Sequence, residues 1–70
     1  MKLDKVVGHG KNSDFHTVIL EETVTGIYAT SEVFYAGEKG SPYTNGKEWR
    51  NKTMDEVVRF YTDELGYTVT

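Results

Sequence analysis

Residues 8–13, which read Gly-His-Gly-Lys-Asn-Ser, carry the pattern that most resembles a phosphate-binding loop. Such a loop needs a glycine five residues before its Gly-Lys pair and a serine or threonine directly after the lysine. Lys5 and Asn12 occupy those two positions. A dinucleotide-binding loop is excluded as well, because Ser13 stands where its third glycine is required. The segment therefore gives no phosphate-binding prediction.

His9, Asp14 and His16 are the residues whose types suit a metal site, since imidazole and carboxylate groups bind zinc. Their spacing matches no compact ligand motif, and the chain contains no cysteine. We interpret them as ordinary loop and strand residues and expect no metal and no other cofactor. None of the serines lies in a nucleophile-elbow sequence. A chain of 70 residues is also short for a large enclosed active site, and chiefly for this reason we expect no enzymatic activity.

The most basic and aromatic stretch lies between residues 43 and 52. Its candidate binding residues are Tyr43, Lys47, Trp49, Arg50 and Lys52. Bases stacked on the rings, with cations on the phosphates, would suit single-stranded nucleic acid. The alternative, which we favour, is a solvated loop that Trp49 anchors to the core. With 8 basic and 11 acidic residues the net charge is −3, which argues against a nucleic-acid partner.

Strand-forming residues occupy three segments before this stretch. A short first strand is predicted over residues 3–8, and longer ones over 15–24 and 27–36, which are rich in β-branched and aromatic types. Thr25-Gly26 is the predicted turn between the two long strands, because glycine adopts positive φ freely. These two strands are expected to form an antiparallel hairpin.

Residues 37–52 contain Asn45-Gly46, a pair that favours tight hairpin turns. A small extra hairpin with residues 43–44 and 47–49 as its arms is one interpretation. A plain loop is the other.

The clearest local signal predicts a helix over residues 53–65. Thr53 and Glu56 have the spacing of a capping box, and Gly66 is a suitable stop. An apolar stripe follows at helical spacing and comprises Met54, Val57, Val58, Tyr61 and Leu65. Residues 67–70 read as a last strand.

These elements predict one α+β domain that spans residues 1–70. A small, mostly antiparallel sheet of about 3–5 strands is expected, with one C-terminal helix packed on one face and the order βββαβ. No apolar run approaches the ~18 residues of a membrane span, and no signal peptide is recognised. We therefore expect a cytoplasmic protein with no membrane partner, of a size and composition typical of bacterial or phage accessory proteins.

A single helix covers one sheet face, and the other face should then be polar. The long strands do not alternate in this way, because Phe15 and Ile19 oppose Val18 and Leu20. In the next strand Ile27, Ala29, Val33 and Tyr35 oppose Tyr28, Phe34 and Ala36. The sequence does not say which set faces the helix.

Three explanations are open for the surplus apolar surface. The sheet could curl into a half-barrel, the loop with Tyr43 and Trp49 could fold over it, or a second copy or another protein could cover it. We predict a non-catalytic protein-interaction module, with a homodimer as one form. Tyr28 and Phe34 join the binding candidates on this hypothesis, and nucleic-acid binding through the Trp49 segment is the alternative.

Overall fold

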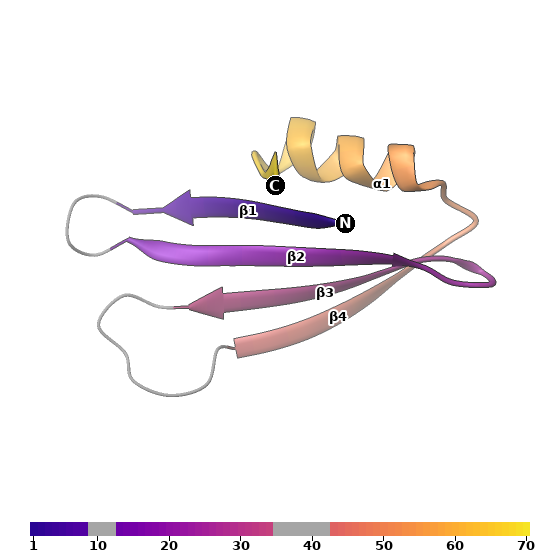
Figure 1. The fold of residues 1–70 in the computed structure, drawn as a ribbon, viewed down its shortest axis with the longest axis horizontal. Coiled ribbons are helices and arrows are strands. Elements are labelled where there is room, and N and C mark those ends of the chain that lie inside the picture. Colours follow the sequence, from indigo (N-terminus) through magenta and orange to yellow (C-terminus); the bar gives the residue numbers. More distant parts are fainter. Residues whose placement is uncertain (9–12, 35–42) are drawn as a thin grey trace.

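A single antiparallel sheet with one helix beside it makes up the computed structural model, which describes residues 1–8, 13–34 and 43–70, with the side chain of Tyr43 left out (Figure 1). The strands are β1 (Lys2–Val7), β2 (Asp14–Glu22), β3 (Gly26–Phe34), β4 (Tyr43–Arg50) and β5 (Thr68–Val69). Their order across the sheet is β4-β3-β2-β1-β5. The predicted α+β class is confirmed, with the helix placed between the fourth and fifth strands.

The turn between β2 and β3 begins at Thr23, two residues earlier than predicted. Thr23 N donates to Gly26 O at 2.8 Å, and Gly26 N donates back to the Thr23 hydroxyl at 3.1 Å. Val24 therefore lies in the turn and not at the end of a strand. Of the predicted strand 27–36, residues 35 and 36 lie outside the described part of the chain.

Residues 43–50 form one continuous strand, so both the hairpin and the plain-loop interpretations of this segment are wrong. Asn45 and Gly46 pair with Ser31 and Thr30 of β3 in an unbroken register. The Asn-Gly pair permits a turn without requiring one, and eight residues of pairing to β3 stabilise the extended form. Asn45 Oδ1 accepts the amide of Gly46 at 2.9 Å.

The core lies between the helix and one face of the sheet. Its fully buried sheet residues are Leu3, Val18, Leu20, Ile27 and Ala29, and its buried helix residues are Val57 and Tyr61. Because these positions alternate along each strand, the helix covers only the face that they share. In Figure 1 the helix runs along the part of the sheet nearer to the β2–β3 turn.

The helix starts as predicted and ends in a different geometry. Thr53 Oγ1 accepts the Glu56 amide at 3.2 Å and Glu56 Oε1 faces the Thr53 amide at 3.4 Å, which confirms the capping box. The α-helix α1 (Met54–Arg59) then widens into a π-helix, η1 (Phe60–Glu64). A π-helix takes more residues per turn, so Leu65 leaves the apolar stripe and is exposed, contrary to the prediction.

Among the described residues, no helix has the length and apolar character needed to cross a membrane.

Candidate functional site

The side of the sheet that faces away from the helix, called here the open face, is the candidate functional site. Its side chains from β1 and β2 are Lys2, Asp4, Val6, Phe15, Thr17, Ile19 and Glu21. Those from β3 and β4 are Tyr28, Thr30, Glu32, Phe34, Thr44, Gly46, Glu48 and Arg50. Strand alternation places all of them opposite the core residues.

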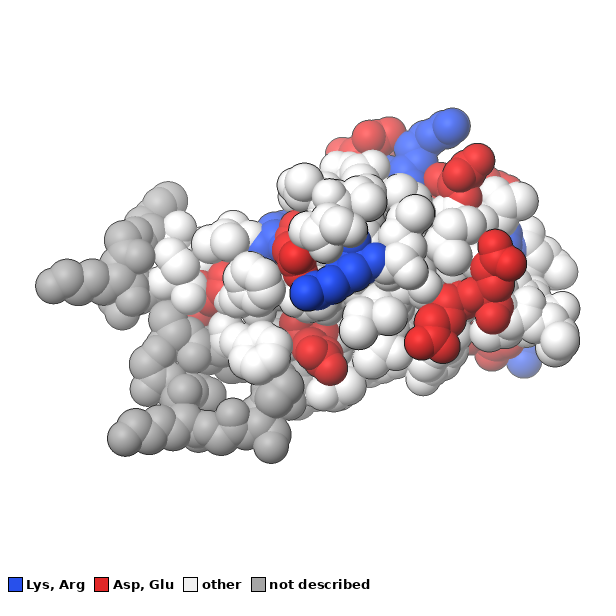
Figure 2. Space-filling view, viewed as in Figure 1, with Lys and Arg blue, Asp and Glu red and all other residues white. Residues whose placement is uncertain are grey.

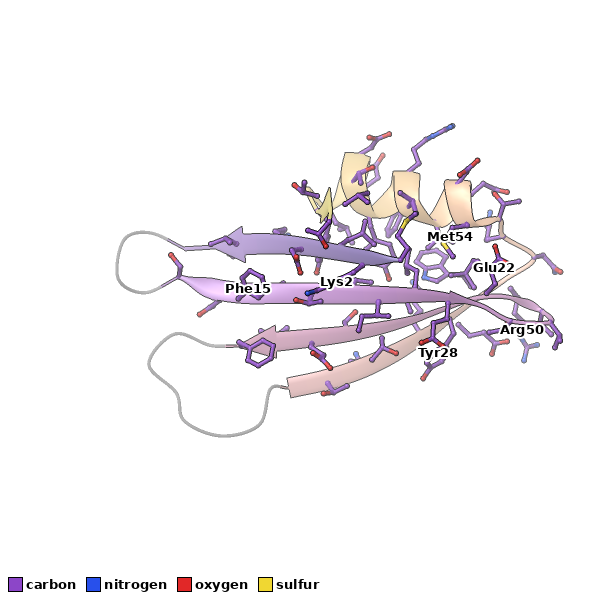
Figure 3. All side chains as sticks on the ribbon, viewed as in Figure 1. Lys2, Phe15, Glu22, Tyr28, Arg50 and Met54 are labelled. Atoms are coloured by element: carbon purple, nitrogen blue, oxygen red, sulfur yellow. The ribbon has the colours of Figure 1, made fainter. Side chains whose placement is uncertain are left out.

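One end of the open face is apolar. Val6 pairs with Phe15 and Phe15 pairs with Phe34, so the three side chains form one row across β1, β2 and β3. Their exposed fractions are 62 %, 40 % and 44 %. Neighbouring exposed aromatic residues are unlike the scattered single apolar residues of an ordinary surface. In Figure 3 Phe15 lies on the viewed side of β2.

The centre of the open face is polar and charged. Thr17 is 5 % exposed, and its hydroxyl donates to Asp4 Oδ1 at 2.9 Å, which orients the carboxylate. Lys2 and Ile19 lie in the next row toward the β2–β3 turn. Figure 2 shows a blue side chain between red ones in the middle of this face, and Figure 3 labels Lys2 at this place.

Tyr28 marks the other aromatic end of the open face. It pairs with Glu21 and Glu48 on the two neighbouring strands. Its hydroxyl occupies the space that a Cβ at position 46 would fill, so Gly46 lets the ring lie flat over β4. The open face therefore has aromatic side chains at both ends and charged side chains between them.

Glu48 has a perturbed carboxyl group at the β4 edge of this face. The Thr25 hydroxyl donates to Glu48 Oε1 at 3.0 Å and Arg50 Nε to the same oxygen at 3.2 Å. These hydrogen bonds, together with the charge of Arg50, hold the pKa of Glu48 below its ordinary value.

We expect Thr25→Val to raise the pKa of Glu48 toward the ordinary value, because the largest cause of its lowering is the Thr25 hydrogen bond. A depressed carboxyl pKa contributes stability above the unfolded-state value of 4.5, and this contribution is lost as the pH falls through the folded-state pKa. Carboxyl-carbon NMR titration measures the pKa directly. An unchanged Glu48 titration in Thr25→Val would contradict the assigned cause.

The structure divides the sequence-predicted binding residues between the two faces. Tyr28, Phe34 and Arg50 lie on the open face, whereas Lys47 and Trp49 lie on the helix side of β4. Lys52 precedes the helix and pairs with Glu56 at 3.7 Å. The side chain of Tyr43 lies outside the described part.

Trp49 packs against the core and not over the open face. Its ring centroid is 5.1 Å from that of Phe60 and 6.1 Å from that of Tyr61, and its Nε1 donates to the Tyr61 hydroxyl at 3.4 Å. Lys47 Nζ lies 4.0 Å from the indole centroid. Trp49 therefore does not cover the apolar surface, which corrects the second of the three explanations for this residue; residues 37–42 and the side chain of Tyr43 lie outside the described part of the chain.

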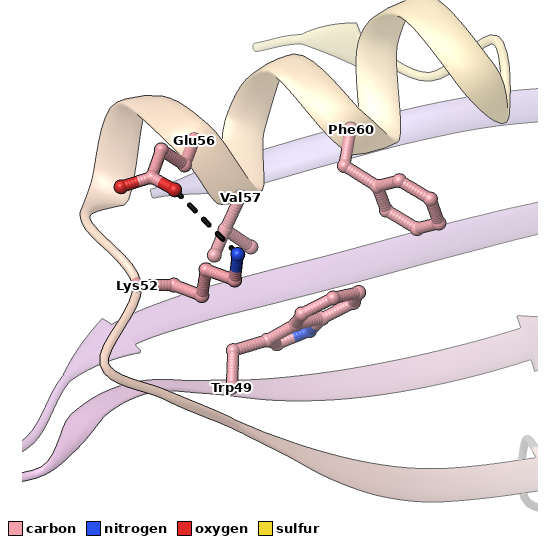
Figure 4. Close-up of a pocket in the computed structure, with 5 residues that line it drawn as sticks. All are labelled: Trp49, Lys52, Glu56, Val57 and Phe60. Atoms are coloured by element: carbon pink, nitrogen blue, oxygen red, sulfur yellow. Dashed lines mark ion pairs between the residues drawn. The ribbon is translucent and has the colours of Figure 1, made fainter.

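A small cavity of about 160 Å³ opens beside Trp49 (Figure 4). Its lining residues are Trp49, Lys52, Glu56, Val57 and Phe60. Figure 4 shows the indole and phenyl rings on one side and the Lys52–Glu56 ion pair on the other. A volume of this size holds about one benzene ring, so the cavity suits a single apolar side chain.

Phe15 and Val6 belong to the site but were not among the sequence-predicted binding residues. The signal that could have found them is the strand period of two, which places Phe15 on the same side as Ile19. Among the residues that the structure describes, no group of three or more His, Cys, Asp or Glu side chains could hold a metal ion. His9 lies outside these residues.

Comparison with known protein families, with curated proteins and with solved structures finds no match for this chain.

Proposed function

We propose that this protein is a small, non-catalytic protein-interaction module whose docking surface is the open face. The observation that carries the proposal is the pair of neighbouring rings, Phe15 and Phe34, which stay 40 % and 44 % exposed on a sheet face that the helix does not cover. Aromatic side chains supply much of the binding energy at protein interfaces. Burial of these rings against a partner removes apolar surface from water.

Phe34→Ser tests the proposal against Val24→Ser as the matched control. Both variants remove an exposed apolar side chain, but Val24 lies in the β2–β3 turn and is 104 % exposed, away from the open face. We expect Phe34→Ser to weaken association about tenfold or more, whether with itself or with a captured host protein, and Val24→Ser to leave it unchanged.

Two measurements compare the association of the two variants. Light scattering over a concentration series gives the solution mass, and affinity capture followed by titration of the captured protein gives heterologous binding. If neither association occurs, or if both variants behave alike, the open face is not a docking surface and the proposal fails.

Single-stranded nucleic-acid binding is the second candidate, supported by two ammonium groups near Trp49. Lys47 lies over the indole and Lys52 lines the adjacent cavity. The contacts of Trp49 with Phe60 and Tyr61 reduce the ring area open to a base, which makes this candidate the weaker one. Titration of labelled single strands at low and moderate salt tests it, and the absence of salt-sensitive binding would remove it.

A further inference from the structure

The strand register arranges the open face in four rows. From the β1–β2 end toward the β2–β3 turn they are Val6–Phe15–Phe34, Asp4–Thr17–Glu32, Lys2–Ile19–Thr30 and Glu21–Tyr28–Glu48. The rows are thus an apolar one, one with two acidic residues, one with a single lysine, and one with a tyrosine between two glutamates. This order decides how a second identical face can pack on the first.

Two identical sheets can pack face to face about a two-fold axis that runs across the strands. Each strand then lies over its own copy in the opposite direction, and rows at equal distances on either side of the axis meet. With the axis between the second and third rows, the second row meets the partner's third row. The first row meets the partner's fourth row.

Charge complementarity favours this placement of the axis. Asp4 then faces the partner's Lys2, and Lys2 faces the partner's Asp4. An axis through the second row would place Asp4 on the partner's Asp4, and an axis through the third would place Lys2 on the partner's Lys2. An axis parallel to the strands along β2 would place Asp4 on the partner's Glu32, and one between β2 and β3 would place Lys2 on the partner's Gly46, with no acidic group to pair with. Like charges held together in this way oppose association.

The same placement matches the aromatic ends. Phe34 at one end of β3 meets the partner's Tyr28 at the other end, and the symmetry repeats this contact. Thr17 meets the partner's Ile19 near the axis. The Asp4–Lys2 pairs and the Phe34–Tyr28 pairs are therefore formed in one arrangement, in which Phe15 faces the partner's Glu21 and the helices lie on the two outer sides.

The available area is sufficient for a weak, specific dimer. Seven residues at about 3.4 Å and four strands at about 4.8 Å give a footprint of about 450 Å² per copy in plane projection. Protruding side chains expose more area than their projection, so the two copies together bury on the order of 1,000 Å², the lower bound for a specific interface.

We infer that the occupant of the open face is a second copy of this chain, packed as an antiparallel β-sandwich with reciprocal Lys2–Asp4 ion pairs and Phe34 against the partner's Tyr28. This inference rests on the proposed function and names its partner. Sandwiched sheets keep their strand directions within about 30°, so the matched rows near the axis stay in register.

Two charge-reversal variants test the inferred dimer, first separately and then as a mixture in which the opposite charges are restored. Asp4→Lys places lysines at positions 2 and 4, and Lys2→Asp places aspartates at both. We expect each variant alone to dimerise at least about tenfold more weakly than the unmodified chain in sedimentation velocity. An equimolar mixture of the two should form heterodimers, because each face then meets its opposite charge. Monomeric variants that stay monomeric when mixed, or variants that dimerise as the unmodified chain does, would overturn the inference.

Two controls keep the result independent of folding. Asp4→Lys removes the acceptor of the Thr17 hydroxyl, so circular dichroism of Asp4→Lys and of Lys2→Asp, each measured alone, checks that both variants keep the fold of the unmodified chain. The chain has no cysteine, so a double Tyr28→Cys/Phe34→Cys variant can be treated with a short bismaleimide, at a protein concentration raised to offset the loss of the two rings. Covalent dimers are expected from the double variant and not from either single one, and equal yields from all three would count against the row assignment.

The failure of this inference is distinguishable from that of the proposed function. A chain that stays monomeric at every concentration refutes the second copy. If a host protein nevertheless binds and Phe34→Ser abolishes that binding, the open face remains a docking surface for a different partner.

Discussion

Leu20→Ala is expected to lower the free energy of unfolding by about 3 kcal/mol, because it leaves a cavity under the helix. The Leu20 side chain is 1 % exposed among Val18, Ala29 and Val57. The adjacent Ile19 points to the open face and is only half-buried, so Ile19→Ala should cost about 1 kcal/mol. A domain of this size has a total stability of only about 4–10 kcal/mol, which makes the first loss a large fraction of the whole.

Urea denaturation at low protein concentration measures both variants without a contribution from self-association. Equal losses from Leu20→Ala and Ile19→Ala would mean that both sides of β2 carry a core, and the open face would not be free. At high protein concentration we expect the difference between the two losses of unfolding free energy to become smaller, because Ile19 becomes an interface residue in the inferred dimer.

The two faces of the sheet could be assigned in part from the sequence because the predicted and the observed β2–β3 turns differ in length by an even number of residues. The predicted turn at Thr25-Gly26 would pair residue 24 with Ile27, whereas the observed turn pairs Glu22 with Ile27. The register of β2 against β3 therefore differs from the predicted one by two residues. A shift of two leaves every side chain on its own face. Phe15 therefore shares a face with Phe34 in either register.

The choice of which face packs on the helix could not be made from β2 and β3 alone. Both faces carry apolar residues there, and the decision depends on Leu3 of β1 and on Trp49 of β4. Each of these comes from a distant part of the chain, so their positions follow only from the complete strand order. Local patterns identified the elements, whereas contacts that are distant in sequence decided how they pack.

The fourth strand was missed because its residues have weak intrinsic strand preference. Asn45, Gly46, Lys47 and Glu48 are all of types depleted in strands. Pairing with β3 overrides that preference, since β3 presents a complete edge for eight residues. The sequence-predicted binding residues lie on two faces because residues 43–50 form a strand. Neighbouring residues of a strand, such as Trp49 and Arg50, point to opposite faces, whereas those of a loop need not.

Gly26→Ala is expected to destabilise the protein by about 3 kcal/mol, through a direct clash with the backbone. Gly26 has φ +153°, and a Cβ there would collide with the carbonyl oxygen of Trp49. Backbone strain of this kind costs about 1–3 kcal/mol, and an added atom that meets backbone costs about 1–3 kcal/mol more. The carbonyl cannot move aside easily, because β4 is paired to β3 along its length.

Gly66→Ala is the matched control, since Gly66 also has positive φ (+75°) but no atom lies within 4 Å of the added Cβ. It bears only the conformational strain, so we expect a loss of about 1 kcal/mol. Thermal unfolding of the two variants, followed by circular dichroism, separates strain from collision. A Gly26→Ala variant no less stable than Gly66→Ala would show that β4 can move away from the β2–β3 turn. Trp49 would then not be held in a fixed position against Phe60, and its role in anchoring the helix would have to be assigned to other contacts.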